Sequence, residues 1–212
     1  MPYDYHVIES SNNWKEQFFT YSDLSKNGLE YLRNSDSTII EIRKYQNGKL
    51  NGNYLKYHDS EMIATVGTFH NDKKIGKWHE FHPNGEIKSS GKYVDGLKSG
   101  LWVSYYENGE VYTSGHYEKG HKINEWLVYF ESGAINHRAF YKDGKKSGDW
   151  KKYFENGKLS ASMHFNNDKK DGAWMKFNEM GDTISYGIYS EGDPTGKWMK
   201  LNENGKKLYA QN

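Results

Sequence analysis

The sequence predicts an all-β fold, an elongated single-layer antiparallel sheet built from tandem β-hairpins of 24 residues. Six of the seven tryptophans recur every 24 residues without insertion or deletion, at Trp78, Trp102, Trp126, Trp150, Trp174 and Trp198. An aromatic run and a turn signal, most often Asn-Gly, follow each of them. Only 35% of the residues are hydrophobic, yet 16% are aromatic and 22 are glycine. This composition is typical of a thin sheet covered by rings, and the fixed period indicates a repeat protein.

Composition and charge exclude several classes of protein. The net charge of +1 gives no general attraction to nucleic acid or to a membrane. Cysteine is absent, which excludes disulfides and thiolate metal sites. No apolar stretch approaches the roughly 18–20 residues of a membrane helix, and the N-terminus does not resemble a secretory signal. We therefore expect a cytoplasmic protein, with the removal of an earlier signal left open.

The repeat register extends to the N-terminus. Counting the tryptophan as position 0, steps of 24 residues lead back from Trp78 to Tyr54, Glu30 and His6. We predict that residues 1–53 are a cap of degenerate repeats and that residues 54–212 are the regular array, ending in a partial repeat. A short helix over residues 13–19 is the alternative, because Asn13-Trp14-Lys15-Glu16 resembles a capping box.

Each repeat is expected to contain two strands. Positions 0 to +5 form the first strand, positions +6 and +7 a type I′ Asn-Gly turn, and positions +8 to +16 the second strand. A loop rich in glycine and lysine, such as residues 143–148, then leads to the next repeat. Ser60-Glu61 lacks the turn glycine, so we expect that turn to be strained or closed differently.

The predicted turn fixes which residues face each other across the hairpin. Position 0 then faces +13, which is usually glycine, and position +4 faces the aliphatic position +9. We expect each indole to cover the glycine opposite it, so that Gly115→Val would clash with Trp102. In the degenerate repeat the same spot pairs Glu30 with Arg43.

Alternation separates two faces of the sheet. Positions 0, +4, +9, +13 and +15 form an apolar face, and +15 is always aromatic. Positions +1, +3, +10, +12 and +14 form the other face, where +3 is an aromatic column among polar residues.

The repeat pattern is similar to a known family. The phrase Gly-x-Trp-x-x-Tyr-aromatic-x-Asn-Gly, followed by an apolar residue and Tyr-x-x-Gly, resembles the bacterial variant of the MORN repeat over about residues 45–205. The resemblance implies a hairpin array with a binding groove. Proteins of this kind resemble antitoxins of toxin–antitoxin systems, and others resemble scaffolds or surface proteins. Departures include Asn124 in place of glycine and the displaced aliphatic residue in Asp182-Thr183-Ile184.

No residue set predicts catalysis or metal binding. Equivalent side chains of successive repeats lie about 10 Å apart, too far for His58 and His82 to share an ion. The carboxylates lie on turns and loops, and no nucleophile elbow or phosphate-binding loop is present. We expect no enzyme activity, no cofactor and no metal. Loop lysines recur at one rim and are interpreted mainly as a solvated edge. They are Lys73, Lys74, Lys77, Lys119, Lys122, Lys142, Lys145, Lys146, Lys169 and Lys170.

The sequence predicts a non-catalytic protein that binds a partner protein, most concretely an antitoxin or immunity protein that occludes a toxin sterically. The alternative is a peripheral scaffold that binds anionic membrane through the lysine rim. Nucleic acid is not expected as a partner, and dimerisation through an end strand stays open. Candidate contact residues are Tyr105, Tyr129 and Tyr153 at +3, Tyr106, Phe130 and Phe154 at +4, and Arg138, His116 and Lys92.

Overall fold

The computed structural model describes residues 4–9, 15–20, 26–201 and 206–211, which form β-strands and no helix. The strands pair with antiparallel neighbours, and the predicted all-β fold of tandem hairpins is confirmed. No helix in the described residues is long and apolar enough to cross a membrane. The chain divides into two compact units, residues 1–109 (unit 1) and residues 110–212 (unit 2). The cap boundary after residue 53 stays a prediction.

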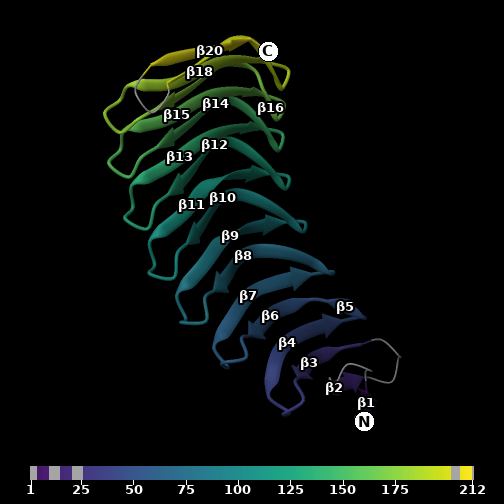
Figure 1. Ribbon diagram of the computed structural model, residues 1–212. Coiled ribbons are helices and arrows are strands. Elements are labelled where there is room, and N and C mark those ends of the chain that lie inside the picture. The colour runs from purple at the N-terminus through teal and green to yellow at the C-terminus, as the bar shows by residue number, and fades with distance from the viewer. Residues whose placement is uncertain (1–3, 10–14, 21–25, 202–205, 212) are drawn as a thin grey trace. The chain divides into compact units, whose positions relative to one another are not determined.

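Unit 1 contains ten strands in the described residues (Figure 1). Within the unit, consecutive strands pair antiparallel, except that the sixth strand pairs with the fourth, past a strand of two residues. They are β1 (Asp4–Glu9), β2 (Lys15–Thr20), β3 (Gly28–Arg33), β4 (Ile39–Gln46), β5 (Lys49–Leu50), β6 (Gly52–Tyr57), β7 (Ile63–His70), β8 (Lys73–Phe81), β9 (Ile87–Val94) and β10 (Leu97–Tyr105). The helix considered for residues 13–19 does not form from Lys15 onward, because β2 begins there; Asn13 and Trp14 lie outside the described residues.

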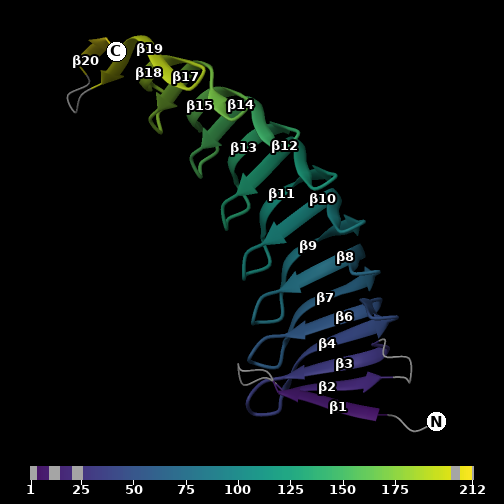
Figure 2. The same cartoon turned by 90° about the vertical axis from the view of Figure 1, so that its right-hand side faces the viewer.

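Unit 2 repeats the same arrangement, as the second view also shows (Figure 2). Its strands are β11 (Val111–Glu118), β12 (His121–Tyr129), β13 (Ile135–Lys142), β14 (Lys145–Tyr153), β15 (Leu159–Asn166), β16 (Lys169–Lys170), β17 (Gly172–Phe177), β18 (Thr183–Ser190), β19 (Asp193–Leu201) and β20 (Lys207–Gln211).

The turn inside each hairpin differs from the predicted type I′ turn. The amide of Gly85 donates to the carbonyl of His82 at 2.9 Å. Gly85 has a φ of 89°, whereas Asn84 does not have a positive φ. This pattern is a type I turn followed by a left-handed glycine, which makes a three-residue loop. Glu61 occupies the glycine position of the irregular turn with a φ of 64°, so that turn closes in the same way but is strained, as expected.

Type I′ turns occur instead between consecutive hairpins. Asp143 and Gly144 have φ values of 50° and 83°, as this turn type requires. Strand β14 resumes directly at Lys145, and Lys145 pairs with Lys142. The loop predicted over residues 143–148 is therefore a two-residue turn followed by strand.

The cross-strand register is correct at position 0. Trp78 pairs with Gly91, Trp174 with Gly187, and Glu30 with Arg43 in the degenerate repeat. The predicted pairing of +4 with +9 is wrong. Phe81, at +3, pairs with Ile87, at +9, because the three-residue loop shifts the register by one near the turn.

The indole that covers each glycine comes from the following repeat, not from the residue paired with it. A Cβ added to Gly91 would lie 2.1 Å from Cδ2 of Trp102, and one added to Gly115 would lie 2.2 Å from Cδ2 of Trp126. Between Ser99 and Val103 the register of β10 against β9 shifts, so three residues of β10 oppose Gly91. Gly100, with a φ of 70°, begins this bulge. The bulge bends the strand and turns the indole back over the preceding glycine.

Candidate partner-binding surfaces

The tryptophan face consists of positions −4, 0, +2, +11, +13 and +15 of each repeat. Its rings form a continuous stack within unit 1. Trp78 contacts Phe69 edge-on at a centroid distance of 5.1 Å, and Tyr93 contacts Trp102 edge-on at the same distance. Trp78 and Trp102 are only 3% and 6% exposed. These rings therefore stabilise the sheet in place of an aliphatic core.

Lysines at position −4 lie over the rings of the tryptophan face. The ammonium nitrogens of Lys74, Lys98 and Lys122 lie 4.2, 4.0 and 4.1 Å from the ring centroid of the tryptophan four residues later. Lys146 and Lys170 lie over Phe165 and Tyr189. Burial lowers the pKa of Lys98, and the charge of Lys74 lowers it further. Four of the predicted rim lysines (Lys74, Lys122, Lys146 and Lys170) therefore belong to the ring stack, not to an open rim.

The tyrosine face lies on the other side of the sheet and contains the +3 column. Tyr105 of unit 1 and Tyr129 and Tyr153 of unit 2 are all half-buried on it. The guanidinium carbon of Arg138 lies 5.7 Å from the ring centroid of Tyr153. Arg138 also approaches Glu125, with a nitrogen–oxygen distance of 3.4 Å. The structure thus brings two predicted contact residues, Arg138 and Tyr153, together.

The other predicted contact residues are placed differently. Tyr106, Phe130 and Phe154 are half-buried at the first position of the hairpin turns, where their carbonyls accept the turn glycine amides. His116 and Lys92 have exposed side chains. Their backbone carbonyls accept the indole N–H groups of Trp126 and Trp102, both at 3.2 Å.

Histidines at position +4 connect consecutive hairpins of unit 1. Nε2 of His58 lies 2.9 Å from the carbonyl oxygen of Phe81, and Nε2 of His82 lies 3.0 Å from that of Tyr105. A carbonyl only accepts, so each Nε2 carries the proton. The sequence suggested that these histidines replace tyrosine in an aromatic column, but it did not predict the hydrogen bond.

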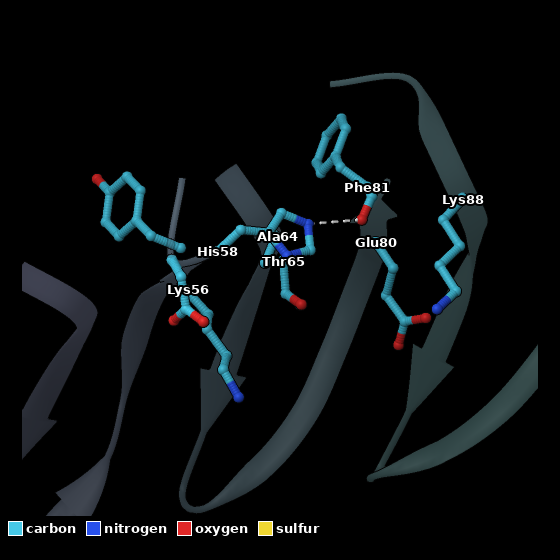
Figure 3. A pocket seen from close by; sticks show the side chains of 9 residues that line it. Lys56, His58, Ala64, Thr65, Glu80, Phe81 and Lys88 are labelled. Carbon is cyan, nitrogen blue, oxygen red and sulfur yellow. Dashed lines mark hydrogen bonds between the residues drawn. The ribbon is translucent and has the colours of Figure 1, made fainter. Parts of the chain in front are cut away.

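A hollow of about 350 Å³ opens beside His58. The pairing between β7 and β8 ends at Thr65 and Glu80, so the two hairpins separate toward their turns. Figure 3 shows His58 reaching the Phe81 carbonyl across this gap. The hollow is lined by Lys56, Tyr57, His58, Asp59, Ala64, Thr65, Glu80, Phe81 and Lys88. Its mixture of two rings with cations and carboxylates suits a charged segment of a protein better than an apolar ligand.

Titratable groups of the described residues form no group of three or more histidines or carboxylates that could hold a metal ion. In unit 2, burial lowers the pKa of His137, and the charges of Lys152, Lys146 and Lys122 lower it further. All three lysines, which belong to the tryptophan face, therefore act on His137.

The fold and its surfaces define a protein of tandem antiparallel β-hairpin repeats. The family model of the MORN repeat variant matches residues 74–95, 98–119 and 146–167. These three segments are thus similar to the MORN repeat variant. No curated protein matches it.

Two solved structures show a faint similarity. The crystal structure of TcdB2-TccC3-Cdc42 is 8% identical over 92% of this chain and 13% of that chain, with a TM-score of 0.22. The structure of the Photorhabdus luminescens Tc holotoxin pore is 10% identical over 96% of this chain and 14% of that chain, with a TM-score of 0.20. This chain thus spans about one seventh of their length, and neither TM-score indicates a shared fold.

Proposed function

We propose that the protein is a non-catalytic, cytoplasmic binding protein that sequesters a partner protein through the tyrosine face. The arrangement of Arg138 over Tyr153 carries this proposal. Arginine and tyrosine are enriched at the centres of protein interfaces, where they contribute most of the binding energy. Strands of unit 2 pack against their neighbours in sequence, so among the described residues no second layer covers this pair.

The most concrete partner is a toxin whose active site the repeat array would occlude. This part of the proposal rests on the resemblance to antitoxins and on the absence of any predicted catalytic set in the sequence. Occlusion needs only a rigid complementary surface, which a sheet held by stacked rings supplies.

Membrane binding is the alternative, and the structure gives it less support. It requires a row of free lysines facing anionic lipid. Four of those lysines lie over rings, and Lys73 and Lys169 approach Asp95 and Glu191, with a nitrogen–oxygen distance of 3.8 Å in each pair.

The test is capture of the partner by the tagged full-length chain from its native host in about 0.5 M salt, where exposed charge attraction is largely screened. We expect one small protein near stoichiometric amounts, toxic when expressed alone and neutralised by co-expression. The double variant R138A Y153S should lose it, whereas K142S K158S, which changes two exposed lysines, should retain it. If both variants retain the partner equally, the partner does not bind through Arg138 and Tyr153, and the tyrosine face is not its contact surface. Recovery of nothing in high salt, with liposome association in low salt, would overturn the proposal in favour of the membrane alternative.

A further inference from the structure

The tryptophan face of unit 2 differs in charge from the same face of unit 1. Between residues 122 and 200, its six columns contain no aspartate or glutamate and six lysines. These are Lys122, Lys146 and Lys170 at position −4, and Lys152, Lys176 and Lys200 at position +2. The equivalent columns of unit 1 include Glu30, Glu41 and Glu80. Although the net charge of the whole chain is near zero, the charged residues in these columns of unit 2 are therefore all positive.

The two lysine columns lie on the same side of the sheet. Lys152 pairs with His137 across β13 and β14, and the His137 ring contacts Trp150 at a centroid distance of 5.6 Å. The charges of Lys122, Lys146 and Lys152 all act on His137. Members of both columns therefore lie within electrostatic range of one ring, that of His137.

The +2 lysines are the accessible members of this set. The side chains of Lys152, Lys176 and Lys200 are exposed, and in the described part of unit 2 none of them forms a salt bridge. The strand carboxylates of unit 2 lie on the opposite face, where Glu125 approaches Arg138 and Asp149 accepts a bond from His164. Asp168 borders the tryptophan face at a turn, where its Oδ1 accepts the Lys146 amide at 2.7 Å. Among the described residues of unit 2, no carboxylate therefore forms a salt bridge with Lys152, Lys176 or Lys200.

We propose that the tryptophan face of unit 2 binds a carboxylate-rich segment of a protein through Lys152, Lys176 and Lys200. The site lies on the opposite side of the sheet from Arg138 and Tyr153 and does not depend on them. Equivalent lysines of successive hairpins are about 10 Å apart, two strand spacings, which equals three residues of an extended chain. An extended acidic segment that crosses the hairpins can therefore place a carboxylate at each lysine.

The ring geometry favours carboxylates over nucleic acid. Binding of single strands relies on aromatic rings with one open face on which bases stack. On this face the ring of Trp126 has Gly115 beneath it and the ammonium group of Lys122 above it, while Trp150 faces His137 and Trp174 faces Trp198 at 5.5 Å. The rings are used within the repeat, and the exposed recognition groups are ammonium ions.

The test measures binding of a fluorescent peptide of about twenty glutamates to the full-length protein by anisotropy in about 0.1 M salt. A glutamine peptide of the same length, an oligothymidylate of about twenty nucleotides and phosphatidylserine vesicles are the comparison probes. The variant K152E K176E K200E removes the proposed contacts. The matched control K142E K158E K197E makes the same change in net charge at exposed lysines of unit 2 outside this face.

We expect the glutamate peptide to bind, the glutamine peptide not to bind, and K152E K176E K200E to weaken the glutamate complex at least about tenfold. The control variant should change affinity by less than about threefold. Absence of glutamate binding, or equal weakening in both variants, would overturn the proposal. Tighter binding of the oligonucleotide or the vesicles through the same three lysines would also overturn it, because the partner would then be a different class of molecule. Each of these results is independent of whether Arg138 and Tyr153 capture a toxin.

Discussion

The contact between Gly115 and the Trp126 indole offers the most direct test of how this sheet is held together. A valine at position 115 would place its Cβ 2.2 Å from Cδ2 of Trp126. An ordinary carbon–carbon contact is about 3.5 Å, so the ring would have to retreat by about 1.3 Å. Overpacking of this kind costs about 1–3 kcal/mol, and retreat would also break the indole hydrogen bond to the His116 carbonyl, at about 1 kcal/mol. We expect a destabilisation of about 2–4 kcal/mol.

Urea unfolding followed by circular dichroism and tryptophan fluorescence measures this loss for Gly115→Val. The melting temperature should fall by about 2–4 °C for each kcal/mol in a chain of this size. Ser114→Val is the matched control, because its side chain lies on the opposite side of the strand and valine suits a strand. It should change the free energy of unfolding by less than about 0.5 kcal/mol.

Repeating Gly115→Val in proteins that lack one tryptophan identifies which ring covers this glycine. In a Trp126→Leu protein the additional cost of Gly115→Val should shrink, because the atoms that it strikes are gone. If the cost persists there but disappears in a Trp102→Leu protein, the ring from the same hairpin covers the glycine and our description of the bulge is wrong.

Three further predictions concern the second unit. Asn124 has a φ of 57°, a left-handed conformation that asparagine and glycine adopt more readily than other residues. Asn124→Ala should therefore lower the free energy of unfolding by about 1 kcal/mol, whereas Asn124→Gly should not. Urea unfolding midpoints of the two variants measure this difference. Lys122→Met keeps the apolar stem but removes the ammonium group from the Trp126 ring, and should cost about 0.5–1 kcal/mol by the same measurement. Burial and nearby lysines lower the pKa of His137, so the folded protein binds this proton less readily than the unfolded chain. Stability should therefore fall as pH drops below the ordinary histidine value of about 6.5, and the urea midpoint of His137→Gln should fall less between about pH 7 and 5.

The hairpin register could be predicted because it follows from the period of the sequence. Position 0 pairs with +13 both at Trp78 and Gly91 and at Glu30 and Arg43, where the residues are different but complementary. The covering ring could not be predicted, because simple alternation does not allow for a bulge. The sequence contained one sign of the bulge, the residue at position −2. It is glycine in most repeats and Asn124 in one, and it has a positive φ in either case.

The turn types show a second limit. Asn-Gly and Asp-Gly both permit a type I′ turn, and the sequence favoured the former at every hairpin. In the structure Asp143-Gly144 takes that conformation, whereas Asn156-Gly157 belongs to a three-residue loop in which only Gly157 has a positive φ. The dipeptide alone does not decide between the two turns, and strand ends are the least certain part of a sequence-based prediction. This error hid the strand that carries the −4 lysines, which then resembled a free rim.

Partner choice depends on the positions where the period fails, because a residue present in every repeat is already explained by the fold. Position 0 and position +15 keep their rings along the array, and those rings pack on one another. Position +2 has no such constraint: it is Lys56, Glu80, Ser104 and Val128 in four consecutive repeats, and it is lysine in successive repeats only at residues 152, 176 and 200. Position +12 is likewise a serine in three repeats and Arg138 in one. A column that the sheet leaves free to vary, and that nonetheless becomes uniform over three successive hairpins, is where selection by a partner would act, which is why Lys152, Lys176 and Lys200 carry more information about binding than the conspicuous tryptophans.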